Sequence, residues 1–161
     1  MKLYPVYDDL IEITSRFAGE VFIDYYSDLI GKDQASYMTD LFLSEDAIRK
    51  LIDSGAVFKI VIDEGIIKGF IEYIREDERV FLSKLYVHRK YRRKGIGKFM
   101  FEDCVKYTKD SGLNRIYLTV NKHNTPSFNV YEHLGFKVID SVVNDIGNGY
   151  VMDDYIMEIT I

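Results

Sequence analysis

Apolar residues recur every three or four positions through the first third of the chain, the spacing of amphipathic helices. This periodicity predicts a long helix over residues 8–29, which Asp8 or Asp9 caps and Gly31 ends. A short strand is expected before it at residues 2–6, and two further helices after it at residues 33–42 and 45–54. The apolar positions that define the long helix are Leu10, Ile13, Phe17 and Val21.

The pattern becomes that of β-strands after residue 56. Runs rich in valine, isoleucine and phenylalanine are separated by the turn sequences Asp63-Glu64-Gly65 and Glu76-Asp77-Glu78. Short strands joined by tight turns are typical of an antiparallel meander. We therefore expect three strands, at residues 57–62, 66–74 and 80–87.

Helices and strands alternate in the last part of the chain. The expected elements are a helix at 95–110, a strand at 115–120, a short helix at 126–134 and closing strands at 136–143 and 150–159. A strand, helix, strand order implies a crossover and a locally parallel pair. The sequence thus predicts the α+β class, with a mixed, mostly antiparallel sheet flanked by helices in a single domain over 1–161.

Composition narrows the class of protein without naming a function. Hydrophobic residues make up 47% and charged residues 29% of the 161 residues, the balance of a globular domain. No apolar run approaches the roughly 20 residues that cross a membrane, and the first residues lack the features of a signal peptide. The only cysteine, Cys104, cannot form an intramolecular disulfide. We expect a cytoplasmic protein.

Charge is distributed unevenly along the chain. Residues 1–60 hold 11 acidic and 6 basic residues and so supply the whole net charge of −5, because residues 61–161 hold 15 of each. Yet six of the ten residues from Arg89 to Lys98 are basic. A local cationic patch on an acidic protein favours a small anionic ligand over nucleic acid. The acidic first third favours a cationic partner.

The segment from Leu82 to Lys98 carries the clearest chemical signal. It reads as an apolar strand, a basic turn, the pair Gly95-x-Gly97 and the start of a helix. The first turn of a helix presents unpaired backbone N–H groups and a partial positive charge. Preceded by glycine and surrounded by basic side chains, it is suited to binding a polyphosphate.

Two nucleotide-binding patterns match this turn poorly. A P-loop requires Ser or Thr after its lysine, and Phe99 follows Lys98 here. A dinucleotide fingerprint requires a third glycine where Met100 stands, and an acidic residue near the end of the next strand, where Asn121 stands.

A third pattern, Arg-x-x-Gly-x-Gly, matches Arg92, Gly95 and Gly97. With it the chain resembles the GNAT superfamily of acyl-CoA-dependent N-acetyltransferases. A second element of that family, Asn-x-x-Ala/Ser-x-x-x-Tyr-x-x-x-Gly-Phe, follows at the family's interval. Its residues here are Asn124, Ser127, Tyr131, Gly135 and Phe136. The two elements together cover about residues 80–140, and the acidic helical region at 8–53 loosely resembles that of the polyamine and diamine acetyltransferases.

The resemblance implies a binding site for acetyl-CoA between splayed central strands. Backbone N–H groups of the turn would hold the pyrophosphate, the strand before it would pair with the pantetheine arm, and two residues of the later helix would contact the coenzyme. The implied cofactor-binding residues are Leu85, Tyr86, Val87, Arg92, Arg93, Lys94, Gly95, Ile96, Gly97, Lys98, Asn124 and Ser127.

Two catalytic roles follow from the same resemblance. Tyr131 matches the general acid that protonates the leaving thiolate. The acceptor amine must also lose a proton, since an alkylammonium has a pKa of about 10.4. Many members of the family carry a carboxylate in the stretch that corresponds to Phe81-Leu82-Ser83-Lys84, which has none. Glu72, on the neighbouring strand, is the predicted base. The alternative interpretation is that Glu72 is a solvated glutamate on a strand face, without a catalytic role.

Other candidate residues carry less chemistry. Asp24, Tyr25 and Asp28 are weaker candidates for contact with the acceptor. The three histidines lack the spacing of metal ligands, so no metal is predicted. Cys104 continues an apolar helical stripe and reads as a buried small residue.

The sequence therefore predicts an N-acetyltransferase that moves acetyl from acetyl-CoA to a primary amine by direct attack. A polyamine or diamine is one acceptor; a protein, a peptide or an amino sugar are others. A non-catalytic acyl-CoA sensor is the alternative from another class. The expected partners are acetyl-CoA and an amine, with no nucleic acid and no membrane, and a homodimer is compatible with the resemblance.

Overall fold

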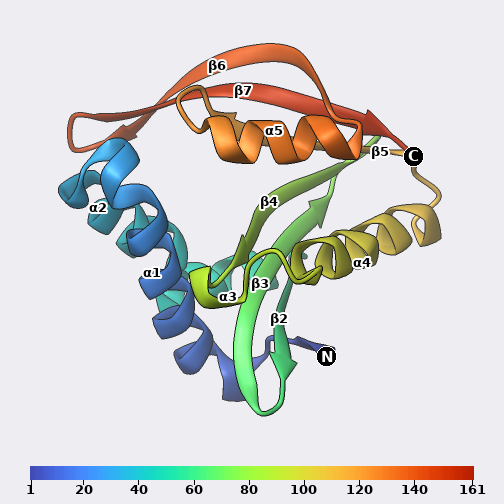
Figure 1. Ribbon diagram of the computed structural model, residues 1–161, viewed down its shortest axis with the longest axis horizontal. Helices are drawn as coiled ribbons and strands as arrows, with labels where there is room; N and C mark the ends of the chain where they lie inside the picture. The colour runs from blue at the N-terminus through green and yellow to red at the C-terminus, as the bar shows by residue number, and fades with distance from the viewer.

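One seven-stranded sheet organises the molecule, with the strand order β1-β2-β3-β4-β5-β7-β6 (Figure 1). The computed structural model describes residues 1–161. The strands are β1 (Lys2–Pro5), β2 (Val57–Asp63), β3 (Ile66–Arg75), β4 (Val80–Val87), β5 (Arg115–Asn121), β6 (Lys137–Gly147) and β7 (Tyr150–Thr160). The helices are α1 (Asp8–Ile30), α2 (Lys32–Leu43), α3 (Glu45–Asp53), α4 (Ile96–Asp110) and α5 (Thr125–Leu134), with a short 3₁₀ turn at Arg89–Tyr91.

The sheet is antiparallel except at its centre, where β4 and β5 run parallel. These two strands pair only at their beginnings, through Val80 with Ile116 and Phe81 with Tyr117. Beyond these pairs the strands separate, and Figure 1 shows the two halves of the sheet diverging from that point. Polar backbone groups of β4 and β5 are thereby left without sheet partners, and such groups are free to bind a ligand.

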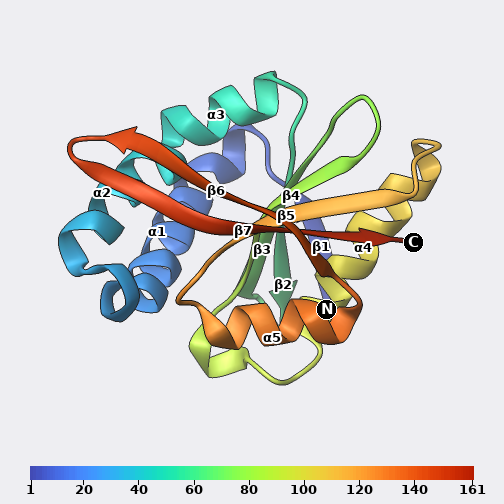
Figure 2. The ribbon, with the colours of Figure 1, turned by 90° about the horizontal axis from the view of Figure 1, so that it is seen from above.

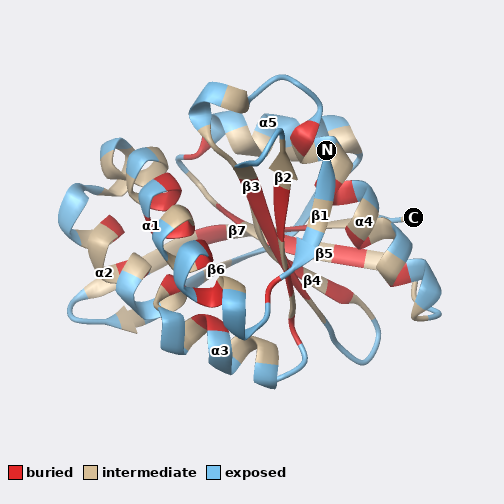
Figure 3. Ribbon diagram, turned by 90° about the horizontal axis from the view of Figure 1, so that it is seen from below, coloured by how far each residue is buried: buried red, intermediate tan, exposed pale blue.

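Helices cover the sheet on both faces (Figure 2). One cluster of 14 buried residues lies on the side of α4 and α5, and a second cluster of 11 lies on the side of α1, α2 and α3. The buried stretches in Figure 3 run along the middle of β2, β3, β4 and β5. The central strands are therefore apolar on both faces, and the opening between β4 and β5 lies between the two clusters.

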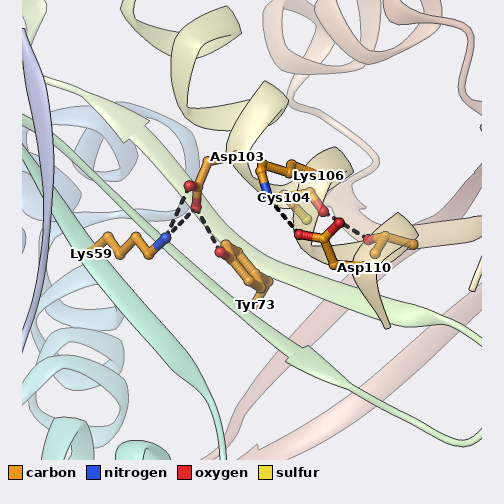
Figure 4. A network of polar contacts seen from close by, with 7 residues as sticks. Lys59, Tyr73, Asp103, Cys104, Lys106 and Asp110 are labelled. Atoms are coloured by element: carbon orange, nitrogen blue, oxygen red, sulfur yellow. Dashed lines mark hydrogen bonds and ion pairs between the residues drawn. The ribbon is translucent and has the colours of Figure 1, made fainter. Parts of the chain in front are cut away.

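A polar network fastens α4 to the sheet (Figure 4). The Lys59 ammonium on β2 lies 2.8 Å from the Asp103 carboxylate on α4, and the Tyr73 hydroxyl on β3 donates to the same carboxylate over 2.6 Å. The neighbouring Cys104 is fully buried, and burial raises the pKa of its thiol to about 12. These contacts fix the position of the helix whose first turn follows the glycine pair, and the thiol stays protonated and inert.

The β6–β7 hairpin is longer than its sequence pattern predicts. We expected the first strand to end at Val143, whereas β6 continues to Gly147. The reason is the Asn148-Gly149 turn, in which both residues have positive φ, 55° and 79°, the conformation of a two-residue hairpin loop. Polar residues continue β6 because it is an edge strand and largely exposed.

The α+β class, the mixed sheet and the splayed central strands are confirmed, and every predicted helix and strand is present within a few residues of its expected bounds. None of the helices combines the length and the apolar character that crossing a membrane requires.

Candidate active site

A cavity of about 660 Å³ opens at the N-terminus of α4, on the side of α5. The Gly95 residue that precedes the helix has φ 81° and ψ 4°, a left-handed conformation that glycine adopts without strain. It turns the chain from the 3₁₀ turn into α4, so that the free N–H groups of the first helical turn lie beside the cavity. We name this the donor cavity.

Most of the residues predicted to bind the coenzyme line the donor cavity. Lys94 and Asn124 are the two of the twelve that do not. Asn124 instead caps α5, where its side chain accepts a hydrogen bond from the Ser127 N–H at 3.3 Å. The predicted residues that line the cavity are Leu85, Tyr86, Val87, Arg92, Arg93, Gly95, Ile96, Gly97, Lys98 and Ser127.

The donor cavity is strongly cationic. Arg92, Arg93 and Lys98 line it, and no acidic residue does. The Arg92 Nε donates to the Val87 carbonyl over 3.0 Å, which fixes its guanidinium beside the end of β4. Basic side chains around a helix N-terminus are the arrangement that binds phosphate groups.

Tyr25 lies at the donor cavity, which differs from the sequence-based expectation. We considered it, with Asp24 and Asp28, for contact with the acceptor. Its hydroxyl instead donates to the Asn124 side chain at 2.9 Å and lies within hydrogen-bond distance of the Ser127 hydroxyl. Asp24, Tyr25 and Asp28 together line a neighbouring cavity, which also contacts the start of α5.

Tyr131 lies on α5 and faces the donor cavity. Its ring packs edge-on against Phe136, with 5.7 Å between the ring centroids. Burial raises the pKa of its hydroxyl well above the ordinary value, and Tyr26 and Tyr25 act in the same direction. The phenol is therefore protonated at neutral pH and has a proton to donate.

A space that we name the passage lies in the opening between β4 and β5 and shares Leu85, Tyr86, Ser127 and Tyr131 with the donor cavity. It is a small cavity of about 30 Å³ lined by residues of both strands and by Tyr26, Tyr86 and Tyr131. The Tyr26 and Tyr86 hydroxyls lie 3.0 Å apart, so that α1 and β4 meet at this point. Burial raises the pKa of both tyrosines, that of Tyr26 to about 12.

A second cavity, of about 390 Å³, lies on the far side of the passage. We name it the acceptor cavity. Tyr26, Ser83, Tyr86 and Thr119 line both this cavity and the passage. Ten of its 17 lining residues are hydrophobic, drawn mainly from α1, α2 and the β6–β7 hairpin. The two cavities thus approach each other across the sheet with Tyr86 lining both.

Asp154 is the only acidic residue that lines the acceptor cavity. It lies on β7 opposite Asn121 of β5, and only 4% of its surface is exposed. Burial, with a smaller effect from Asp153, raises the pKa of its carboxyl to about 6. The sequence left this segment unassigned, although strand alternation places Asp154 on the same face as the apolar Met152 and Ile156 and places Asp153 on the other face.

Glu72, the predicted base, is held in an ion pair. Its carboxylate lies 3.0 Å from the Lys84 ammonium and is 1% exposed, and it does not line the acceptor cavity. Lys84, on the next strand, does line it. A buried carboxylate that pairs with a lysine and lies outside the cavity favours a structural role for Glu72.

Comparison with known proteins agrees with this geometry. Residues 9–136 match the acetyltransferase (GNAT) family. A probable N-acetyltransferase of Drosophila melanogaster is 27% identical over 96 residues, 56% of this chain, and the match spans about half (52%) of the fly protein. The spermidine N(1)-acetyltransferase of Thermoplasma acidophilum is 26% identical over 114 residues, 68% of this chain and 71% of that protein.

Solved structures show the same fold. An N-acetyltransferase from Thermoplasma acidophilum, solved in complex with coenzyme A, superposes with a TM-score of 0.82 at 23% identity over all of both chains. The family match covers most of the sequence, both family elements lie at the donor cavity or beside it, and the sheet opens where the two cavities approach each other. The chain belongs to the acetyltransferase (GNAT) family and is an acyltransferase.

Proposed function

We propose that the protein transfers an acetyl group from acetyl-CoA, bound in the donor cavity, to a primary amine bound in the acceptor cavity. The observation that carries the proposal is the passage between the two cavities, lined by Tyr26, Tyr86 and Tyr131. A thioester that enters from one side and an amine that enters from the other meet there without either crossing the sheet. Such an arrangement favours direct attack over a covalent enzyme intermediate.

The donor is proposed to bind through its phosphates and its pantetheine arm. The pyrophosphate accepts hydrogen bonds from the first N–H groups of α4 and ion pairs with Arg92, Arg93 and Lys98. The edge of β4 at Leu85 to Val87, which has no partner strand on the β5 side, binds the amide groups of the pantetheine arm. Ser127 contacts the coenzyme from the start of α5.

The transfer conserves atoms and charge. An acceptor that arrives as an ammonium loses one proton, and its lone pair then forms a C–N bond to the thioester carbonyl carbon. The C–S bond breaks, and the sulfur leaves with the electron pair. Tyr131 gives its proton to that sulfur, and the acceptor nitrogen loses a second proton, which restores the phenol. The net products are the amide, the thiol of coenzyme A and one proton in solvent.

The names of some relatives and the charge of this chain make polyamines one class of acceptor to test. The Thermoplasma relative acts on spermidine, and the first 60 residues of this chain carry an excess of five negative charges. A polycation is attracted to such a surface. Polyamines therefore belong in any test of the acceptor, beside monoamines, peptides and amino sugars.

A thiol-release assay with acetyl-CoA and a panel of primary amines tests the proposed function. We expect thiol release that depends on both the amine and acetyl-CoA, with acetylated amine found by mass spectrometry. Coenzyme A that binds without turnover of any amine would support the acyl-CoA sensor instead. Absence of coenzyme A binding would overturn the assignment of the donor cavity.

A further inference from the structure

The acceptor cavity carries a charge pattern that selects among amines. Only two charged side chains line it, Lys84 and Asp154. The Lys84 ammonium is neutralised by Glu72 at 3.0 Å. The carboxylate of Asp154 has no hydrogen-bond or ion-pair partner in the protein, although the residue is 96% buried. The cavity therefore presents one unpaired negative charge, and a buried charge without a partner is costly unless a ligand supplies one.

Most of the remaining wall is apolar, and its uncharged polar members are Gln34, Ser83, Thr119, Asn121 and Asn144. Phe22 and Ile30 of α1, Met38 and Phe42 of α2 and Ile146 of β6 line the cavity together with Phe81 of β4. Side chains of this kind bind hydrocarbon or aromatic groups, and they offer no carboxylate to a second ammonium. A second cation would find no second carboxylate on this wall.

We propose that the acceptor is a primary monoamine on an apolar body, bound with its nitrogen against Asp154 and its body against the α1–α2 wall. This inference rests on the proposed function and names the substrate class of its acceptor cavity. Asp154 is then the catalytic residue that orients the acceptor nitrogen and takes its first proton. The volume of about 390 Å³ is of the size that encloses a small arylalkylamine or alkylamine.

The electrostatic environment of Asp154 supports this role. Its carboxyl has a pKa of about 6, so it is ionised at neutral pH yet is a stronger base than an ordinary aspartate. The charged and titratable groups around it are Asp153 on the same strand, Lys122 after β5, Lys84 on β4 and Tyr26 on α1. The tyrosine is neutral, since its pKa is about 12, and Lys122 is engaged with Asp153 at 2.9 Å.

The first experiment compares 2-phenylethylamine and n-hexylamine with spermidine and 1,4-diaminobutane in the thiol-release assay. We expect kcat/KM for the two monoamines to exceed that for both polyamines by about 10-fold or more, because each extra ammonium lacks a carboxylate partner. A preference for spermidine would overturn the monoamine inference and leave the proposed acetyltransferase standing. Coenzyme A binding with no turnover of any amine would overturn both.

Asp154→Asn is the matching substitution. It should lower kcat/KM for 2-phenylethylamine by about 50-fold, the loss expected for a removed charge-assisted contact, and leave the Kd of coenzyme A unchanged. The low-pH limb of kcat/KM near pH 6 should disappear. The control is Asp153→Asn, which alters the adjacent carboxylate that pairs with Lys122 on the other side of the strand. Equal effects of the two variants, or a retained limb, would overturn the role of Asp154.

A gain of specificity provides a test that does not depend on the stability of Asp154→Asn. Gln34, on α2, lines the same cavity, and its amide donates to the Val151 carbonyl over 2.9 Å. Gln34→Glu adds a second carboxylate and should raise kcat/KM for 1,4-diaminobutane relative to 2-phenylethylamine by about 10-fold. An unchanged ratio would show that charge in this cavity does not select the acceptor.

Discussion

The donor and acceptor cavities lie on opposite sides of one opening in the sheet, yet the chain builds them in different ways. The donor cavity is lined by Tyr25 and by two short stretches, residues 85–98 and 126–131. The acceptor cavity draws residues from Phe22 to Asp154, on six helices and strands. Backbone N–H groups at a helix terminus dominate the first, and side chains brought together by folding dominate the second.

The two cavities therefore differ in which amino-acid substitutions they accept. A phosphate site made of backbone groups and a glycine turn depends on local geometry, so a short sequence motif is enough to identify it. An apolar wall with one carboxylate depends on which side chains meet, and many sequences satisfy the same fold there. We therefore expect changes on the donor side to affect every reaction equally, and changes on the acceptor side to affect the choice of amine.

The largest effect is expected from breaking the ion pair between Glu72 of β3 and Lys84 of β4. Lys84→Met leaves the Glu72 carboxylate buried without a partner, since its exposed surface is 1%. The free energy of unfolding should fall by about 3–5 kcal/mol in urea denaturation. The double variant Glu72→Gln with Lys84→Met should recover most of this loss. A loss below about 1 kcal/mol would contradict a structural role for the pair and return Glu72 to consideration as the base.

The next effect belongs to the donor side alone. At Gly97 an added Cβ would meet only Val87 Cγ2, at 3.9 Å, so the fold accepts a side chain there. Gly97→Val places branched carbon atoms in the cavity and should raise the Kd of coenzyme A, measured by calorimetry, by about 100-fold or more, since several hydrogen bonds to phosphate are lost. Gly97→Ala is the control and should bind nearly as well. If the valine variant bound coenzyme A as tightly as the native protein does, the phosphate site would lie elsewhere than at this turn.

Tyr131→Phe should separate chemistry from binding. Loss of the phenolic proton should lower kcat by about 100-fold while the Kd of coenzyme A stays within about twofold. Tyr4→Phe, on the edge strand β1, is the matched control and should leave both quantities unchanged. An unchanged kcat for Tyr131→Phe would remove this residue from the acid role. The effect should be the same for every amine, because the leaving sulfur is common to all.

The smallest effect concerns stability and pH on the acceptor side. The pKa of Asp154 is raised from 3.8 to about 6 by folding, so the folded state binds the proton more tightly than the unfolded state does. The stabilisation from the protonated carboxyl is therefore complete below about pH 4 and is lost as the pH rises through 6. The difference in free energy of unfolding between Asp154→Asn and the native protein should therefore depend on pH. It should favour the variant by about 2 kcal/mol more at pH 7 than at pH 4. A difference that does not change with pH would contradict the burial of this carboxyl.

Much of the fold follows from local pattern. The helices and the meander appear within a few residues of their predicted bounds because apolar periodicity and turn sequences act over short distances. The end of β6 was missed because its residues are polar and its length is set by the Asn148-Gly149 turn and by pairing with β7. We expected Tyr25 to contact the acceptor, and its place at the donor cavity was missed. Its hydrogen-bond partners Asn124 and Ser127 lie about 100 positions away in the chain, and no local pattern reveals contacts over that distance.

The sequence by itself determined the α+β class, the phosphate turn at Gly95 and Gly97 and the family, because each depends on contiguous residues whose spacing is read directly. Only the tertiary structure decided which carboxylate faces the acceptor. Glu72 and Asp154 are both strand residues with acidic side chains, and pattern does not distinguish them. Strand pairing gives Glu72 a lysine partner and leaves Asp154 unpaired in a cavity. The physical reason is that the chemistry of a buried charge is set by its neighbours in space.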